Sequence, residues 1–467
     1  MQDEPVLSRR RLLAAASAGA LATAMNKLAG AAVDAAPPSI LFILADDLGY
    51  ADLSCYGRRE YRTPNIDSLA EQGLKLTHSY SNSSICSPTR CALITGRYQY
   101  RFPIGLHEPL PRNGTLGLPP DHPTLPSLLR SLGYRTALIG KWHLGTAPER
   151  GPLQHGYERF FGVHGGAVDY FTHEFAVPPT GESQLYENAS RIERNGYLTD
   201  LLTSEAIKEI EHSAAGQRPF FLSLHYTAPH WPWEGPQDEA VSKSLRTIFH
   251  TDGGSLDTYA AMMRSLDEGV GRVLRSLSRL QLERDTIVVF TSDNGGERFS
   301  DMWPFTGMKA ELLEGGIRVP TLVRWPGRIE AGSLSEQVMM TMDWLPTLLA
   351  AAGGHPDARY PSDGDSLLPV LVGRASAHPR TIYWRFKANE QAAVRSGHWK
   401  YLKIGANEFL FDLVNDPRER ANLSQRHPEV FHDLKAAYAA WDKTMLQYPA
   451  DSYTYSQKDG ARVPDRY

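Results

Sequence analysis

The chain has 467 residues, of which 42% are hydrophobic and 22% charged, so it is long enough to bury a large core and to form two domains. Its formal net charge of −4 excludes a generally basic surface of the kind that binds nucleic acid or anionic lipid. Any affinity for an anion must therefore come from a local cluster of cations, and we expect no nucleic-acid partner. Three cysteines are too few for a disulfide framework; Cys55 and Cys91 could form a bridge or remain two small buried thiols.

Residues 1–36 have the pattern of an export signal. Three arginines follow Ser8, and an apolar, alanine-rich stretch over 12–24 then leads into a region of small residues. The stretch is too short to span a bilayer, and paired arginines are typical of the twin-arginine pathway, which exports folded proteins. We therefore predict a twin-arginine signal peptide, the twin-arginine export machinery as a partner, and a periplasmic or secreted location.

Four short apolar or β-branched runs each lead into polar residues of the kinds that catalyse reactions or bind metals. The runs are 39–45, 135–140, 220–225 and 286–290. Their continuous apolar character is typical of parallel strands that are buried on both faces. Helical patterns lie between them, at 65–72, 124–132, 198–213 and 258–280. This alternation predicts an α/β fold with a large, mostly parallel sheet flanked by helices.

The polar residues should meet at one edge of that sheet. In open α/β sheets the ligand crevice lies beyond the carboxyl ends of the strands. Asp46 and Asp47 follow the first run, Lys141 and His143 follow the second, and Asp293 follows the fourth. We therefore expect the functional site at this edge.

The pattern changes after about residue 370. Hairpin-like segments at 381–386, 392–404 and 408–413 precede an amphipathic helix over about 428–445. We predict a catalytic domain over 37–370 and a smaller C-terminal subdomain over 371–467, with a short antiparallel sheet and a covering helix. The polar tail from Asp451 is expected to be ordered only where it docks on the rest of the chain.

The most specific segment spans 86–97. It begins Cys-Ser-Pro-Thr-Arg and ends Thr-Gly-Arg. Pro88 suits the first turn of a helix, Ser87 can cap it, and Gly96 is placed to end it. The segment therefore predicts Cys86 at a helix N-terminus, where free amides attract anions.

This segment resembles the signature of the type I sulfatases, in the arylsulfatase and N-acetylgalactosamine-sulfatase branch of the alkaline phosphatase superfamily. The resemblance covers essentially the whole mature chain and implies an alkaline-phosphatase-like fold. In that family a maturation enzyme oxidises the cysteine to formylglycine, whose hydrate attacks sulfur with one hydroxyl and expels sulfate with the other. The resemblance thus implies Cys86 as the precursor of the nucleophile and a formylglycine-generating enzyme as a partner. Thr89 stands where serine is commonest in the family, which bears on the efficiency of maturation.

Four side chains are candidate metal ligands. Asp46, Asp47, Asp293 and Asn294 offer only oxygen atoms, which suits calcium or magnesium. We expect no imidazole or thiolate beside them, which argues against zinc. The resemblance implies one Ca²⁺ ion, with Mg²⁺ possible, and places the modified Cys86 in the ligand set.

Three further blocks match motifs of the same family. They are Gly-Lys-Trp-His at 140–143, Pro-His-Trp-Pro at 229–232 and Gly-Met-Lys at 307–309, the last followed by Glu-Gly-Gly-Ile-Arg-Val-Pro at 314–320. Glu314 and Arg318 of the last block are expected to form a structural pair.

The resemblance and the charges together imply catalytic roles for these blocks. Arg90, Lys141 and Lys309 would neutralise the sulfuryl group, and Arg90 could instead hold the diol. His143 would act as the base of the elimination step, while His230 and Lys309 would protonate the departing alkoxide.

The predicted reaction converts a sulfate ester to an alcohol and sulfate, on a sulfated small molecule or carbohydrate. A phosphonate monoester or phosphodiester hydrolase of the same superfamily is the main alternative, because it shares the cysteine motif and the metal site. A noncatalytic binder of sulfated glycans is a second. Residues 165–173, Trp231, Trp233 and Trp303 could contact the organic part of the substrate or pack as ordinary core.

Overall fold

The computed structural model of the protein describes residues 37–111 and 116–455. The predicted signal peptide over 1–36 lies outside these described residues. From Pro38 onward the chain belongs to one compact unit.

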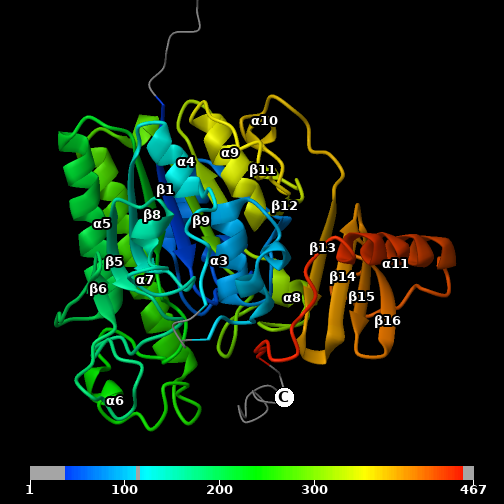
Figure 1. The fold of residues 1–467 in the computed structure, drawn as a ribbon, viewed down its shortest axis with the longest axis horizontal. Helices are drawn as coiled ribbons and strands as arrows, with labels where there is room; N and C mark the ends of the chain where they lie inside the picture. Colours follow the sequence, from blue (N-terminus) through cyan, green and yellow to red (C-terminus); the bar gives the residue numbers. More distant parts are fainter. Residues whose placement is uncertain (1–36, 112–115, 456–467) are drawn as a thin grey trace, which may run out of the picture. The chain divides into compact units, whose positions relative to one another are not determined.

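A ten-stranded sheet lies at the centre of this unit (Figure 1), with the strand order β11-β2-β10-β9-β1-β8-β4-β5-β6-β7. Its strands are β1 Ser39–Ala45, β2 Leu74–Leu76, β4 Arg135–Lys141, β5 Arg159–Val163, β6 Leu185–Glu187, β7 Ser190–Arg191, β8 Phe220–His225, β9 Thr286–Ser292, β10 Thr321–Arg324 and β11 Ser333–Ser335. The central pairs β9–β1, β1–β8, β8–β4 and β4–β5 are parallel, while β10 runs antiparallel to β9 and β2. The predicted α/β fold with a mostly parallel sheet is confirmed.

Helices cover both faces of this sheet. One face is covered by α2 Pro64–Glu71, α5 Leu198–Ala215 and α7 Leu256–Arg279, and the other by α3 Cys86–Thr95, α4 Leu125–Ser131 and α9 Trp344–Ala351. The one-turn helices α6 Glu239–Ser242, α8 Glu314–Ile317 and α10 Leu368–Leu371 lie in the connections. Short 3₁₀ segments are Ser54–Tyr56, Gln99–Arg101, Pro103–Leu106, Pro152–His155, Glu283–Asp285, Thr341–Asp343 and Ala388–Glu390. No helix within the described ranges is both long and apolar enough to cross a membrane.

The alternation of side chains along β1 explains why both faces are covered. Leu41 and Ile43 point into a cluster built with α2, α5 and α7, whereas Phe42 and Leu44 point into a second cluster with α3, α4 and α9. A strand that is apolar on both sides is stable only when both sides are packed. Cys55 and Cys91 lie against opposite clusters, and all three cysteines are free.

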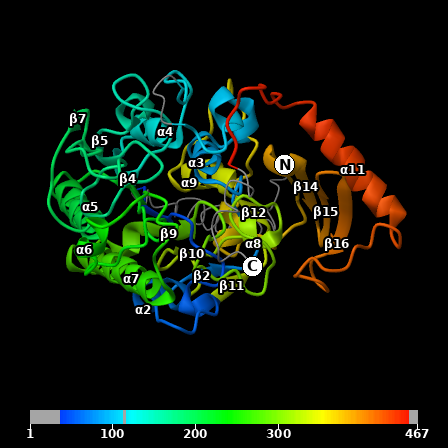
Figure 2. The ribbon, with the colours of Figure 1, turned by 90° about the horizontal axis from the view of Figure 1, so that it is seen from below.

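A separate four-stranded antiparallel sheet follows in the chain (Figures 1 and 2). Its elements are β13 Thr381–Phe386, β14 Gln391–Ser396, β15 Trp399–Ile404 and β16 Asn407–Asp412, covered by α11 Pro428–Asp442. Leu434 of α11 packs on Val394, Tyr401 and Leu410 of the sheet. The predicted hairpins and covering helix are confirmed, with α11 ending three residues earlier than expected. Two further short strands, β3 Ser79–Tyr80 and β12 Met339–Met340, pair with each other.

Buried charges connect the small sheet to α8, the helix that precedes β10 of the large sheet. Lys400 of β15 reaches Glu314 of α8 at 3.0 Å and Glu419 at 2.8 Å. Arg318 lies 3.2 Å from Glu314, so the predicted pairing of these two residues is confirmed. Burial alone would raise the pKa of Glu314, but Lys400 and Arg318 outweigh it and lower this pKa to about 2. The Gln391 side chain of β14 also bonds the backbone at 310 and 312, just after Lys309.

Candidate active site

The ends of β1 and β9 bring four oxygen-bearing side chains together. Asp46 and Asp47 follow β1, and Asp293 and Asn294 follow its parallel neighbour β9. The backbone N–H of Asp47 donates to Asp293 Oδ1 at 3.2 Å, and Asn294 Nδ2 donates to Asp47 Oδ1 at 2.7 Å. All four residues are buried. The predicted metal ligands therefore form one cluster at the carboxyl edge of the sheet.

Cys86 is the first residue of α3, as the sequence predicts. The helix ends at Gly96, whose φ of 66° is the left-handed conformation that glycine adopts most easily. The prediction that Ser87 caps the helix is wrong. Since the helix already begins at Cys86, the capping position falls on Ile85, and Ser87 Oγ instead accepts from the Leu110 N–H at 2.7 Å.

The Cys86 thiol is buried among charged groups. Only 3% of the residue is exposed, and burial raises the pKa of the thiol to about 11. The thiol is therefore protonated at neutral pH. Its sulfur, one oxygen each from Asp46 and Asp47 and a ring nitrogen of His230 all lie within 4.8 Å of one another. The expectation that no imidazole accompanies the carboxylates is wrong, because β8, the strand before His230, is the sheet neighbour of β1.

Two cations pair with carboxylates of this cluster. Arg90, one turn along α3 from Cys86, donates from Nη2 to Asp293 Oδ2 at 2.7 Å. Lys141, at the end of β4, donates from Nζ to Asp46 Oδ2 at 2.5 Å. All four side chains are at most 1% exposed. The site thus holds cations deep inside the fold, where they can act on a bound anion with little screening.

A third cation faces the cluster from the loop before α8. Lys309 Nζ donates to Asp47 Oδ2 at 2.5 Å and lies 3.3 Å from His230 Nε2 and 3.7 Å from Glu297 Oε2. Burial lowers the pKa of this ammonium, but Asp47 and Glu297 outweigh it and raise the pKa well above its usual value. Lys309 therefore stays charged.

Both histidines are neutral in this environment. Burial, followed by nearby cations, lowers the pKa values of His143 and His230 well below the usual value. His230 Nδ1 lies 2.7 Å from the Trp231 carbonyl, so this nitrogen carries the proton and Nε2 is left to accept from Lys309. His143 Nε2 contacts the Leu110 carbonyl at 3.3 Å, which leaves the buried Nδ1 as the acceptor. Each ring thus presents one basic nitrogen.

The donor set fits a hard divalent cation. Asp46 Oδ1 and Asn294 Oδ1 are buried and have no hydrogen-bond partner, which is costly unless a cation binds them. Three carboxylates and one amide oxygen are the ligands that calcium or magnesium prefers. The residues present therefore fit the predicted metal.

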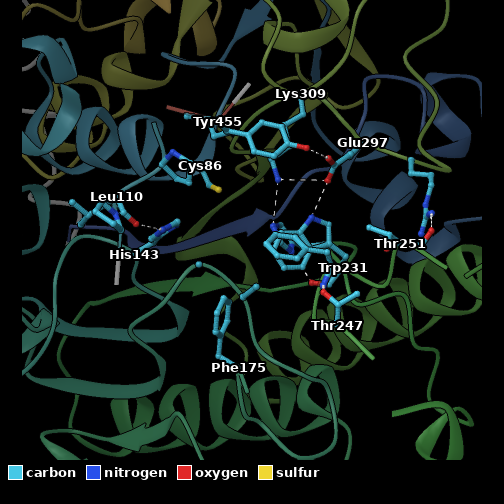
Figure 3. A pocket seen from close by; sticks show the side chains of 18 of the residues that line it. Cys86, Leu110, His143, Phe175, Trp231, Thr247, Thr251, Glu297, Lys309 and Tyr455 are labelled. Atoms are coloured by element: carbon cyan, nitrogen blue, oxygen red, sulfur yellow. Dashed lines mark hydrogen bonds and ion pairs between the residues drawn. The ribbon is translucent and has the colours of Figure 1, made fainter. Parts of the chain in front are cut away.

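A cavity of about 820 Å³ opens beside Cys86 (Figure 3). Of the predicted contacts to the organic part of a substrate, Gly166, Ala167, Trp231 and Trp233 line it. Trp303 is 60% exposed and is not among the lining residues. The other lining residues are Ile85, Pro109, Leu110, Pro111, His143, Phe175, His230, Thr247, Phe249, Thr251, Glu297, Arg298, Lys309, Tyr453 and Tyr455.

Sequence reasoning did not find several of these residues. Glu297 lies three positions after Asn294 and could have been noticed from that proximity. Phe175, Phe249, Tyr453 and Tyr455 carry no local signal, because only tertiary contacts bring them to the cavity.

Two family models match the chain. A model described as Sulfatase matches residues 38–354, and one described as N-sulphoglucosamine sulphohydrolase, C-terminal, matches residues 308–442. The first covers more than half of the chain and contains each predicted site residue.

Individual relatives show the same similarity. N-acetylgalactosamine-6-sulfatase of Canis lupus familiaris is 34% identical over 394 residues, which cover 79% of this chain and 72% of that protein. Arylsulfatase J of Mus musculus is 31% identical over 471 residues, which cover 88% and 77%. The crystal structure of Ps i-CgsB in complex with k-i-k-neocarrahexaose has a TM-score of 0.80 and 30% identity, over 91% of this chain and 96% of that one.

Proposed function

We propose that this chain, which belongs to the sulfatase family and is a sulfuric ester hydrolase, works through a formylglycine made from Cys86 and acts outside the cytoplasm. One observation carries the catalytic part of this proposal. Cys86 lies at the start of α3, beside the cluster of paired carboxylates and cations. It also lines a cavity that is large enough for a small organic molecule. The nucleophile, the anion-binding groups and the substrate space therefore adjoin one another.

The modified side chain supplies a reactive group that a thiol lacks. As the hydrate it offers one hydroxyl for attack on sulfur and a second whose deprotonation releases sulfate. An unmodified Cys86 could take up the sulfuryl group but has no second hydroxyl to expel it. We therefore propose that Cys86 requires a formylglycine-generating enzyme.

The surrounding side chains position the ester and move protons. Lys141 and Lys309 draw the sulfuryl oxygens into the site, and Lys309, which is charged, gives a proton to the departing alkoxide. His230, which is neutral, orients that ammonium by accepting from it at Nε2. His143 presents a neutral imidazole, as the base of the elimination step requires. Arg90 holds Asp293 and the backbone carbonyl of Lys141, so its main role is to fix the helix against the cluster.

We propose that the cluster binds one calcium ion, with magnesium as the alternative. Asp46, Asp47, Asp293, Asn294 and the modified Cys86 would hold it, and bound metal would polarise the sulfate oxygens. Asp46 Oδ1 and Asn294 Oδ1, which accept no hydrogen bond, support this assignment. A ring nitrogen of His230 lies within 4.8 Å of one oxygen each of Asp46 and Asp47, at the edge of this ligand set.

Sulfated carbohydrates and aryl sulfates are the proposed substrates. The names of the relatives, N-acetylgalactosamine-6-sulfatase and arylsulfatase, cover both classes. The phosphonate monoester or phosphodiester alternative is not favoured by the family model or by these relatives. A noncatalytic glycan binder is disfavoured by the presence of Cys86, His230 and Lys309 together.

Export is proposed from the pattern at residues 8–24. Replacing both Arg9 and Arg10 by lysine should retain the protein in the cytoplasm of its host, whereas the unchanged chain should appear in the periplasm or medium. If fractionation found the lysine variant and the unchanged chain in the same compartments in equal proportion, export by the twin-arginine pathway would be excluded.

Mass spectrometry of the peptide that contains Cys86 tests the nucleophile directly. We expect the mass of formylglycine in active protein from the native host. Hydrolysis of 4-nitrophenyl sulfate should exceed that of 4-nitrophenyl phosphate and of a phosphodiester. An unmodified thiol in fully active protein would disprove the proposed nucleophile.

A further inference from the structure

The C-terminal end of the described chain returns to the active site. After α11 the segment 446–455, which we call the strap, runs back along the catalytic core (Figure 1). The Leu446 N–H donates to the Tyr100 carbonyl at 3.0 Å, and Lys387 Nζ donates to Ser452 Oγ at 2.8 Å. The polar tail predicted from residue 451 is therefore docked as far as the description extends.

A buried carboxylate anchors the strap. Glu108 accepts from Tyr448 Oη at 2.5 Å and from Thr454 Oγ1 at 3.2 Å. Its backbone N–H donates to the Tyr453 carbonyl at 2.9 Å, and its carbonyl accepts from the Tyr455 N–H at 2.5 Å. Glu108 is fully buried, and residues 109–111, directly after it, line the cavity. The anchor and the cavity wall are thus one continuous piece of chain.

The anchor leaves two aromatic side chains of the strap in the cavity wall. Tyr453 and Tyr455 both line the cavity. Tyr455 Oη lies 3.4 Å from Glu297 Oε1, while Trp231 Nε1 donates to the other oxygen of the same carboxylate at 3.0 Å. Figure 3 shows Tyr455 and Trp231 joined through Glu297 in this way. The centre of the Phe249 ring lies 4.8 Å from the centre of the Trp231 ring, so Phe249 extends the aromatic surface.

The charged groups of this region already have partners. Arg298 donates to the carbonyls of His250 and Gly253, at 2.6 and 2.8 Å, and its guanidinium lies 4.1 Å from the centre of the Trp233 ring. Glu297 accepts from Trp231 Nε1 at 3.0 Å and lies 3.7 Å from Lys309 Nζ, so its carboxylate is also engaged. Away from the sulfate-binding end, recognition must therefore use aromatic faces rather than ion pairs.

We propose that Tyr453 and Tyr455 are specificity-determining residues that, with Trp231, bind the ring carrying the sulfate ester. The inference deepens the proposed function and rests on it. The ring has an apolar face, as an aryl group or a pyranose does, and carries no second anionic group. The strap thus supplies a wall of the substrate site that lies outside the sequence motifs of the chain.

Binding to a protein that cannot turn over tests this proposal. In a Cys86→Ala background, dissociation constants are measured by ligand-observed NMR for 4-nitrophenyl sulfate, galactose 6-sulfate and inorganic sulfate. Tyr453→Ala and Tyr455→Ala should each weaken binding of at least one ring ester by about 5- to 30-fold, and of inorganic sulfate by less than about 2-fold. Losses confined to one ester would identify that ring type as the one bound.

A matched control is Trp303→Ala, which removes an exposed aromatic ring that does not line the cavity and should leave all three constants unchanged. Tyr453 is itself 47% exposed, so its replacement should not unfold the protein, and a thermal melt checks this. Unchanged ester binding in both tyrosine variants, or an equal loss for inorganic sulfate, overturns the inference. Ring-dependent binding in a chain whose matured wild-type form hydrolyses no sulfate ester would instead overturn the proposed function alone.

Discussion

Arg90 donates from both Nε and Nη2 to a single oxygen of Asp293, at 3.0 and 2.7 Å. The bond ties α3, which begins with Cys86, to the end of β9. Arg90 also donates to the backbone carbonyl of Lys141 at 3.2 Å, so one guanidinium fixes three parts of the site. Both partners are buried, and breaking a buried pair by removing one member typically costs about 3–5 kcal/mol, although Asp46 Oδ1, 3.5 Å from Arg90 Nη2, keeps a second carboxylate beside the guanidinium.

Asp293→Ala should therefore lower metal affinity, activity and folding stability together. Calcium-dependent shifts in melting temperature report the affinity, and urea denaturation reports the free energy of unfolding. The matched control is Asp343→Ala, which breaks a comparable buried pair with Arg380 away from the site. It should reduce stability without reducing the calcium-dependent shift; a similar loss of that shift would mean that Asp293 acts only through folding.

Removal of bound metal from the wild-type protein should also abolish activity. A chelator such as EDTA should abolish turnover of 4-nitrophenyl sulfate, because three buried carboxylates and a buried amide oxygen would lose their cation. Calcium should restore the rate fully and magnesium at most partly. Full activity after exhaustive chelation, with metal content checked by elemental analysis, would argue against a metal in the mechanism.

Cys86→Ala should abolish turnover, with a loss of at least about 10³-fold in kcat, while the fold remains intact. The chain offers a close control in Cys91→Ala, because Cys91 is a fully buried thiol on the same helix but belongs to a core cluster. That variant should keep its rate. Circular dichroism and initial rates with 4-nitrophenyl sulfate suffice, and normal turnover by the Cys86 variant would rule out the nucleophile.

His230→Ala should slow the hydrolysis of sugar sulfates more than that of 4-nitrophenyl sulfate. General acid help typically contributes 10²–10⁴-fold, but nitrophenolate leaves without much protonation. We expect losses in that range for a sugar ester and under about 10-fold for the nitrophenyl ester, measured as kcat/KM. Equal losses on both esters would place His230 among the groups that hold the cation, where its ring nitrogen lies near the carboxylates.

Glu108 gives the strap a dependence on pH. Burial raises the pKa of this carboxyl from 4.5 to about 7, although hydrogen bonds from Tyr448 and Lys387 oppose the rise. The folded chain therefore binds more protons than the unfolded chain between pH 4.5 and 7, and stability falls as the pH rises through this window. The cost above pH 7 approaches ~3 kcal/mol at 1.36 kcal/mol per pKa unit.

Glu108→Gln, which resembles the protonated acid, isolates this contribution. Its stability should match the wild type near pH 5 and exceed it at pH 8, as measured by urea denaturation at both values. A difference between the two proteins that does not change with pH would show that Glu108 is ionised throughout.

The central strands could be predicted because each is buried on both faces and is therefore apolar along its whole length, as in the run before Asp46. The short strands β6, β7, β11 and β12 have two or three residues each, and their composition carries no such pattern. The wrong prediction that Ser87 caps α3 arose because the start of a helix cannot be located to within one residue from sequence, and that one residue decides which side chain occupies the capping position.

The same limit applies to the site. Cys86, Lys141 and Lys309 stand in contiguous motifs, so local sequence was enough to nominate them. The proximity of His230 to Asp47 depends on which strands are neighbours, and the position of Tyr455 depends on a bond to the backbone of Glu108. Such contacts arise from tertiary packing and leave no trace in local composition.

The charged contacts between the small sheet and α8 also bear on modularity. Lys400 keeps Glu314 ionised, and Gln391 holds the backbone beside Lys309 in place. A fragment cut after residue 370 would lose both supports, and with them the loop that presents a catalytic ammonium group. The small sheet thus holds part of the active site in place. Exchanging it between related chains would require the exchange of its buried contacts as well.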